Sequence, residues 1–145
     1  MQIKHKLPPN HNQIKQVLKT TEYTIYCYGD IIYNPSGLPL TDDLEYHESI
    51  HAHQQKLMGV EEWWEKYLED KRFRLEQEIE AYKLQMEYAD EHYDRPKRRE
   101  IKKEIIKNLS SDLYGKLLTK KEVKEILEKD KRLRKKEDKI ITAKS

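Results

Sequence analysis

Residues 41–59 read TDDLEYHESIHAHQQKLMG, and within them His47, Glu48 and His51 form the pattern H-E-x-x-H. Four residues of an α-helix turn through about 400°, so the two histidines point in the same direction, one turn apart. Two imidazole nitrogens placed in this way can bind one metal ion, and Glu48 then lies to the side of the remaining coordination position. A glutamate at that point can accept a proton from an activated water molecule, which is the role of a general base.

The surrounding stretch predicts an α-helix that begins after Thr41 and ends at Gly59. Thr41 is a favourable N-cap, acidic residues follow in the first turn, where the helix dipole favours negative charge, and glycine commonly ends a helix. The stripe that faces the interior consists of Leu44, His47, His51, Gln54 and Met58. His53 points about 160° away from His51 and is not an expected ligand. The alternative to metal binding is a pair of core histidines satisfied by hydrogen bonds.

A second amphipathic helix is predicted over residues 73–93, and it carries the third candidate ligand, Glu78. Its apolar stripe consists of Leu75, Ile79, Tyr82, Met86 and Ala89. With Leu75 at 0° and about 100° per residue, Glu78 falls near 300°, on the flank of this stripe. The glutamates expected on the solvent face are Glu76, Glu80 and Glu87. A buried carboxylate needs a partner, which can be a metal ion or a core Arg, Tyr or His.

Residues 22–34 are rich in Tyr, Ile and Thr and predict a β-hairpin with its turn at Gly29 and Asp30. The single cysteine, Cys27, falls in this stretch, so the chain has no internal disulfide and a packed thiol is expected. An edge strand next to the H-E-x-x-H helix can pair with an extended peptide. The alternative is a hairpin that only covers the core.

The remaining segments predict helices and their connections. An extended lead-in and a short helix are expected over residues 1–20, and a helix over residues 60–68 that covers the core with Trp63 and Trp64. Further helices are expected after Pro96, the last of which opens with a capping box at 119–122. The fold class is therefore α+β and mostly α, with a small hairpin or sheet packed on the H-E-x-x-H helix and the long helix that follows it.

Charge divides the chain unevenly, although the net charge is only +2. Residues 1–94 hold 10 Lys and Arg against 18 Asp and Glu, whereas residues 95–145 hold 19 against 9. We therefore expect a compact domain over residues 1–118 and a basic helical C-terminal tail over residues 119–145. The tail can either meet an anionic partner or fold back on the acidic body.

No apolar run approaches the ~18 residues of a membrane helix, and the first residues do not form a signal peptide. A soluble protein is expected, with no membrane partner.

The two motifs together resemble the zincin metallopeptidases, and among them the gluzincins in their short form, the minigluzincins. In that group the H-E-x-x-H helix supplies two ligands and a glutamate of a later helix supplies the third, often in the motif Glu-x-x-Ala. Here that motif reads Glu78-Ile79-Glu80-Ala81, which places the ligand on Glu78 independently of the helical geometry. The runs HESIHAHQQ (47–55) and EIEAYKLQ (78–85) are also similar to small peptidases encoded by bacteriophages. The resemblance covers about residues 22–90.

The resemblance implies a minimal zincin fold and a zinc-dependent peptidase with one Zn²⁺ per chain, bound by His47, His51 and Glu78, with Glu48 as the general base. Its substrate would be a peptide or protein, and its location the cytoplasm of the producing cell, or the virion if it is phage-encoded. Many gluzincins have an acidic residue directly after the alanine, where this chain has Tyr82. The candidates for stabilising the oxyanion are Tyr82, His92 and Tyr114.

Two other functions are compatible with the sequence. A zinc-bound module of the same fold could hold a peptide without cleaving it, although zinc binding alone does not require Glu48. A nucleic-acid or phage-assembly accessory protein could act through the basic tail. This last function is the least favoured, because Lys and Glu alternate along much of the tail and aromatic residues for base stacking are scarce there.

Overall fold

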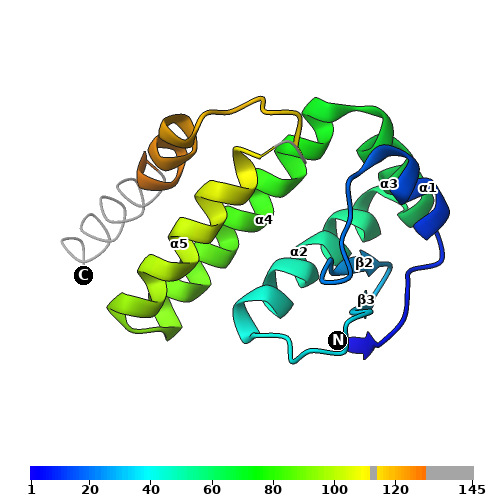
Figure 1. Ribbon diagram of the computed structural model, residues 1–145, viewed down its shortest axis with the longest axis horizontal. Helices are drawn as coiled ribbons and strands as arrows, with labels where there is room; N and C mark the ends of the chain where they lie inside the picture. The colour runs from blue at the N-terminus through cyan, green and yellow to red at the C-terminus, as the bar shows by residue number, and fades with distance from the viewer. Residues whose placement is uncertain (112–113, 130–145) are drawn as a thin grey trace, which may run out of the picture.

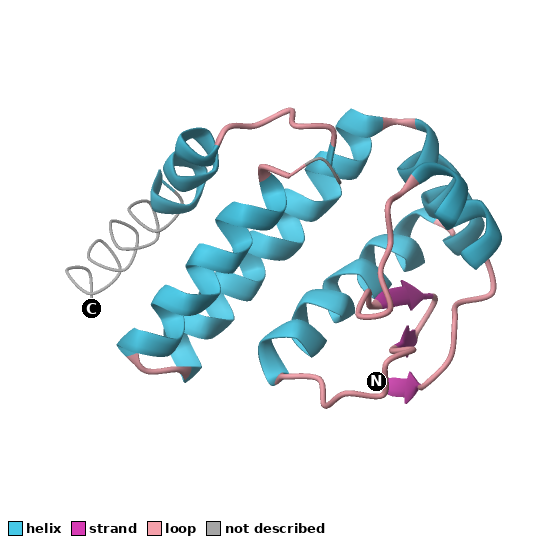
Figure 2. Ribbon diagram, in the orientation of Figure 1, coloured by secondary structure: helices cyan, strands magenta, loops and turns pink. Residues whose placement is uncertain are grey.

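A computed structural model describes residues 1–111 and 114–129 of the chain. The protein is α+β and mostly helical, as the sequence predicts (Figures 1 and 2). Its elements in chain order are β1 (Gln2–Lys4), α1 (His11–Val17), β2 (Tyr26–Tyr28), β3 (Ile31–Tyr33), α2 (Asp42–Met58), α3 (Val60–Glu69), α4 (Lys71–His92) and α5 (Arg95–Leu109). A further helix runs from residue 120 to the end of the described part at residue 129.

The β region is a three-stranded sheet in the order β1-β3-β2. β2 and β3 form the predicted antiparallel hairpin, in which Tyr28 pairs with Ile31 across the two-residue turn. Gly29 occupies the first position of this turn with φ of 64°, a conformation that glycine adopts without strain. β1 pairs in parallel with β3, a contact that the sequence did not predict. β2 is left at the edge of the sheet, next to α2.

α2 and α3 are separated by one residue, Gly59, whose φ of 105° and ψ of 133° end the first helix and begin the next. Thr41 is the N-cap of α2, as expected, although its side chain makes no capping hydrogen bond. Asp70 is the N-cap of α4, and its carboxylate accepts hydrogen bonds from the backbone N–H groups of Arg72 and Phe73. This cap separates α3 from α4, which correspond to the helices predicted over residues 60–68 and 73–93.

The layers follow from the contacts between elements. α2 packs against β2 on one side and against α4 on the other, and α5 packs on α4 (Figure 1). One apolar cluster joins α4, α5 and the last described helix. A second apolar cluster joins α1, the hairpin and α3, and it includes Trp63 and Trp64, which cover the core as expected. The buried residues of α2 are all polar and lie between the two clusters; they are Asp43, His47, Glu48, His51, Gln54 and Gln55.

The capping box predicted at 119–122 is present. Thr119 N–H donates to Glu122 Oε1 and Glu122 N–H donates to Thr119 Oγ1, both at 3.1 Å. The helix that it opens packs Val123 and Leu127 into the cluster formed with α4 and α5. The first ten or so residues of the predicted tail thus contribute to the core of the domain, while the charged stretch from residue 130 on lies outside the described residues.

Within the described ranges, no helix combines the length and the apolar character that crossing a membrane requires.

Candidate metal centre

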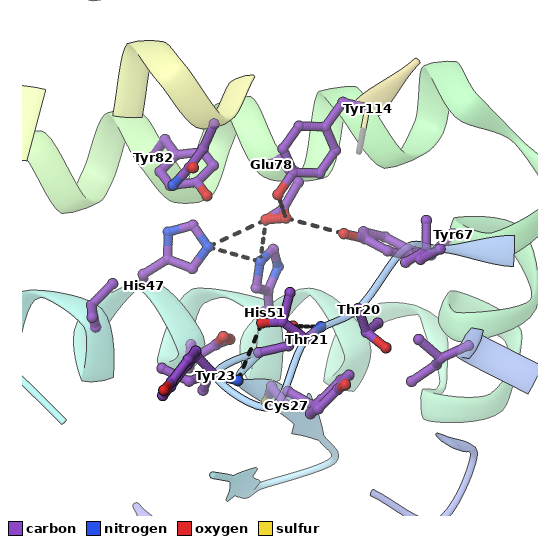
Figure 3. Close-up of a pocket in the computed structure, with 18 of the residues that line it drawn as sticks. Thr20, Thr21, Tyr23, Cys27, His47, His51, Tyr67, Glu78, Tyr82 and Tyr114 are labelled. Carbon is purple, nitrogen blue, oxygen red and sulfur yellow. Dashed lines mark hydrogen bonds and ion pairs between the residues drawn. The ribbon is translucent and has the colours of Figure 1, made fainter. Parts of the chain in front are cut away.

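Three buried donor atoms converge between α2 and α4 (Figure 3). Glu78 Oε1 lies 2.6 Å from His51 Nε2 and 3.2 Å from His47 Nε2, and the two Nε2 atoms are 3.1 Å apart. The histidines lie one turn apart on α2, and α4 packs on α2 so that Glu78 faces them. Ligand atoms of all three residues lie within 4.8 Å of one another. The structure therefore brings the three predicted ligands together as a candidate metal site.

The other ring nitrogen of each histidine faces a glutamine oxygen. His47 Nδ1 lies 3.0 Å from Gln85 Oε1, and His51 Nδ1 lies 2.8 Å from Gln54 Oε1. An amide oxygen only accepts hydrogen bonds, so both Nδ1 atoms carry hydrogen and donate. The amide of Gln85 is oriented in turn because its Nε2 donates to Asp43 Oδ2 at 2.7 Å. Both Nε2 atoms are thereby directed at the Glu78 carboxylate, an arrangement that a cation between the three atoms would satisfy.

The second oxygen of Glu78 has different partners. Tyr67 and Tyr114 each donate a phenol hydrogen bond of 3.1 Å to Oε2 (Figure 3). Arg74 holds the end of α3 that presents Tyr67, since its Nε donates to the Tyr67 carbonyl at 2.8 Å and its guanidinium lies 5.6 Å from the centre of the ring. The Glu78 carboxylate therefore contacts both Tyr and His side chains, two of the partners that a buried glutamate can have besides a metal ion.

The electrostatics of the cluster favour an ionised Glu78. Burial alone would raise the pKa of this carboxyl group, but the charge and hydrogen bonds of His51 and His47 outweigh burial and hold the pKa far below its usual range. Burial alone would lower the pKa of His51, but the adjacent Glu78 carboxylate raises it to about 9. In the metal-free protein, a protonated His51 therefore balances the negative charge of the Glu78 carboxylate.

Glu48 lies next to this cluster and differs from Glu78 in its surroundings. It is buried, with 8% of its surface exposed, and its Oε2 has no hydrogen-bond partner among the described residues. Burial raises the pKa of Glu48, and the neighbouring rings of His51 and His47 counteract this rise only in part. An unpartnered buried carboxylate oxygen is costly unless a ligand or water molecule completes its hydrogen bonding.

A cavity of about 430 Å³ opens beside these residues. Its walls include Glu48, the three candidate ligands, residues 18–21 and 23–25 from the connection between α1 and β2, residues 26 and 27 of β2, and Asn108 of α5. Glu48 and the three candidate ligands therefore share the lining of one cavity.

The other predicted site residues have different positions. Tyr82 and Tyr114 line the cavity, and the Tyr82 ring lies 4.4 Å from that of His47. His92 is exposed at the end of α4, where it stacks on Tyr88 at 4.0 Å, and it does not line the cavity. His53 is exposed on α2, as its position on the helix predicted.

The edge strand β2 is tied to the helices by side chains. The Cys27 carbonyl accepts hydrogen bonds from Gln55 Nε2 at 2.8 Å and from Trp64 Nε1 at 3.1 Å. Gln55 Oε1 in turn accepts from the backbone N–H of Gly29 at 2.7 Å. Because this carbonyl is already engaged, the hairpin covers the core at Cys27 rather than offering a peptide a free partner there. The thiol itself is buried and donates to the Gly29 carbonyl at 3.3 Å, as expected for a packed cysteine.

Sequence reasoning missed the glutamines and the aspartate that orient the histidines. Gln85 follows Glu78 by seven residues, or two turns of α4, and Asp43 precedes His47 by four residues, or one turn of α2. Each therefore lies on the face of its helix that carries a ligand, and this spacing is the signal that could have identified them. Together they fix the orientation of His47.

Comparisons of the chain with protein-family models, curated proteins and solved structures found no match.

Proposed function

We propose that this chain is a zinc-dependent peptidase that hydrolyses peptide bonds with an activated water molecule. The observation that supports this best is the convergence of His47 Nε2, His51 Nε2 and Glu78 Oε1, with both Nδ1 atoms committed to glutamine oxygens. Two imidazoles and one carboxylate form a ligand set of catalytic zinc sites, which leave one coordination position for water or substrate. The cavity gives a substrate access to the same residues.

Glu48 has the properties of the general base. When bound at the three donors, Zn²⁺ would supply a Lewis acid that lowers the pKa of water and polarises a carbonyl group. Glu48 accepts the proton that water loses, because it lines the cavity beside the three ligands and one of its carboxylate oxygens has no hydrogen-bond partner among the described residues. Its raised pKa makes it a stronger base than an exposed glutamate. The protonated carboxyl group then donates this proton to the leaving amine.

The metal centre is tested by the zinc content per chain, measured by elemental analysis after purification without added metal. We expect about one zinc per chain in the wild type and a sharp reduction in Glu78→Ala, because the variant loses one of three ligands. Glu76→Ala removes an exposed glutamate from the same helix and should retain the wild-type content. A folded wild-type protein that takes up no zinc, even when zinc is added, would refute the metal centre.

The catalytic step is tested by cleavage of an unstructured, dye-labelled protein such as casein. Glu48→Gln should abolish cleavage and retain zinc, because the amide keeps the shape of the side chain but cannot accept the proton from water. Glu61→Gln, an exposed change on α3, should cleave at the wild-type rate. Cleavage by Glu48→Gln at the wild-type rate would contradict the mechanism. Zinc binding without any turnover by the wild type would instead favour the non-catalytic peptide-binding module.

A further inference from the structure

The two oxygens of Glu78 are divided between two sets of partners. Oε1 faces His51 Nε2 at 2.6 Å and His47 Nε2 at 3.2 Å, whereas Oε2 accepts hydrogen bonds from Tyr67 and Tyr114. We propose that Tyr67 and Tyr114 are positioning residues that keep Glu78 a one-oxygen ligand and so keep a coordination position of the metal open. This inference rests on the proposed zinc site.

A free carboxylate could fill that position itself. Glutamate binds metal ions through one oxygen or through both, and the second oxygen of a chelating carboxylate takes up space that water or substrate needs. In this chain Oε2 already accepts two phenol hydrogen bonds, and bringing it to the metal would weaken them. Both hydroxyls belong to buried residues, and a buried donor left without a partner is costly. The two bonds therefore oppose chelation.

The two hydroxyls are also fixed from different parts of the chain, so they cannot follow a shift of the carboxylate together. Tyr67 is on α3, where its ring stacks on Trp63 at 4.7 Å and its backbone carbonyl accepts from Arg74. Tyr114 follows α5 and is buried in the apolar cluster of α4 and α5. Figure 3 shows the two rings approaching Glu78 from different directions. A carboxylate anchored from two elements retains its orientation when the metal binds.

The test uses the full chain loaded with Co²⁺, which reports its coordination number through visible absorption and X-ray absorption. Four-coordinate Co²⁺ absorbs visible light more strongly than five- or six-coordinate Co²⁺. The double variant Tyr67→Phe with Tyr114→Phe keeps both rings and removes both hydroxyls. We expect its visible absorption to fall and one oxygen to be added to the first coordination shell. Tyr33→Phe is the matched control, because this buried tyrosine of the second apolar cluster lies outside the cavity lining and donates no hydrogen bond to Glu78 among the described residues. It should retain the wild-type spectrum.

The outcomes separate this inference from the proposed function. A double variant with the wild-type spectrum would overturn the positioning role and leave the metal centre intact. Wild-type protein that binds no Co²⁺ would overturn both. The wild type alone provides a second test that does not depend on how the variant folds, since X-ray absorption that shows a chelating carboxylate in the wild type would also overturn the positioning role. Each single variant should lie between the wild type and the double variant.

Discussion

Zinc binding to the metal-free protein should release about one proton at pH 7. The Glu78 carboxylate raises the pKa of His51 to about 9. Because pH 7 lies well below this pKa, His51 carries its second proton in most metal-free molecules at pH 7. Zinc requires the free Nε2 lone pair, and the proton must leave. Glu78 contributes no proton, because its pKa is held far below this range.

Calorimetric titration with Zn²⁺ in buffers of different ionisation enthalpy measures this number directly. The slope of the observed enthalpy against the buffer enthalpy should be about one proton per zinc. The titration should be repeated in Glu48→Gln, because the raised pKa of Glu48 could add a second contribution. The apparent affinity should increase about tenfold per pH unit between pH 6 and 8 and level off above about pH 9. A slope near zero at pH 7 would show that His51 is already neutral and would refute this description of the cluster.

The same proton affects the stability of the metal-free fold. The folded-state pKa of His51, about 9, lies above the usual histidine pKa of about 6.5. The resulting stabilisation is therefore fully present below about pH 6.5 and is lost as the pH rises through about 9. Urea denaturation of metal-free protein across this range should show the decrease, and a protein whose stability rises from pH 7 to 9 would contradict it.

Two further substitutions test parts of the structure that lie outside the three ligands. Gln85→Leu removes the acceptor of His47 Nδ1 and should weaken zinc binding about 10- to 100-fold in a chelator competition, whereas Gln16→Leu on the exposed face of α1 should not. Leu127→Ala creates a cavity in the core and should lower the free energy of unfolding by about 3 kcal/mol, measured with urea. Leu117→Ala is the exposed control, with an effect below about 0.5 kcal/mol. Equal effects of the two leucine variants would show that the last helix is not part of the core.

The sequence predicted what depends on local periodicity. The helix bounded by Thr41 and Gly59, the hairpin turn at Gly29, and the burial of Glu78 all follow from patterns within a few turns or residues. Burial of Glu78 at 4% exposure, with Glu76 and Glu80 exposed, matches the angles calculated from the helix.

The features that the sequence did not predict depend on contacts between distant segments. β1 has only three residues, two of them polar, and it forms only because β3 lies beside it. The hydrogen bond from Gln85 to Asp43 joins residues 42 positions apart. The hydrogen bond from Tyr114 to Glu78 joins residues 36 positions apart, and no local periodicity specifies it.

The polar buried face of α2 has a consequence for the cooperativity of unfolding. One apolar cluster lies toward α4 and α5, the other toward the sheet and α3. The buried residues of α2 meet these clusters with polar side chains, and apolar contact across the boundary comes from the partly buried Met58 of α2 and Phe73 of α4. Hydrogen bonds depend strongly on distance and direction, whereas hydrophobic stabilisation is non-directional. The two clusters can therefore unfold as separate units when the polar contacts are weakened. An ion bound by α2 and α4 together would couple the two units, so that the chain melts in a single transition with the metal and in two without it.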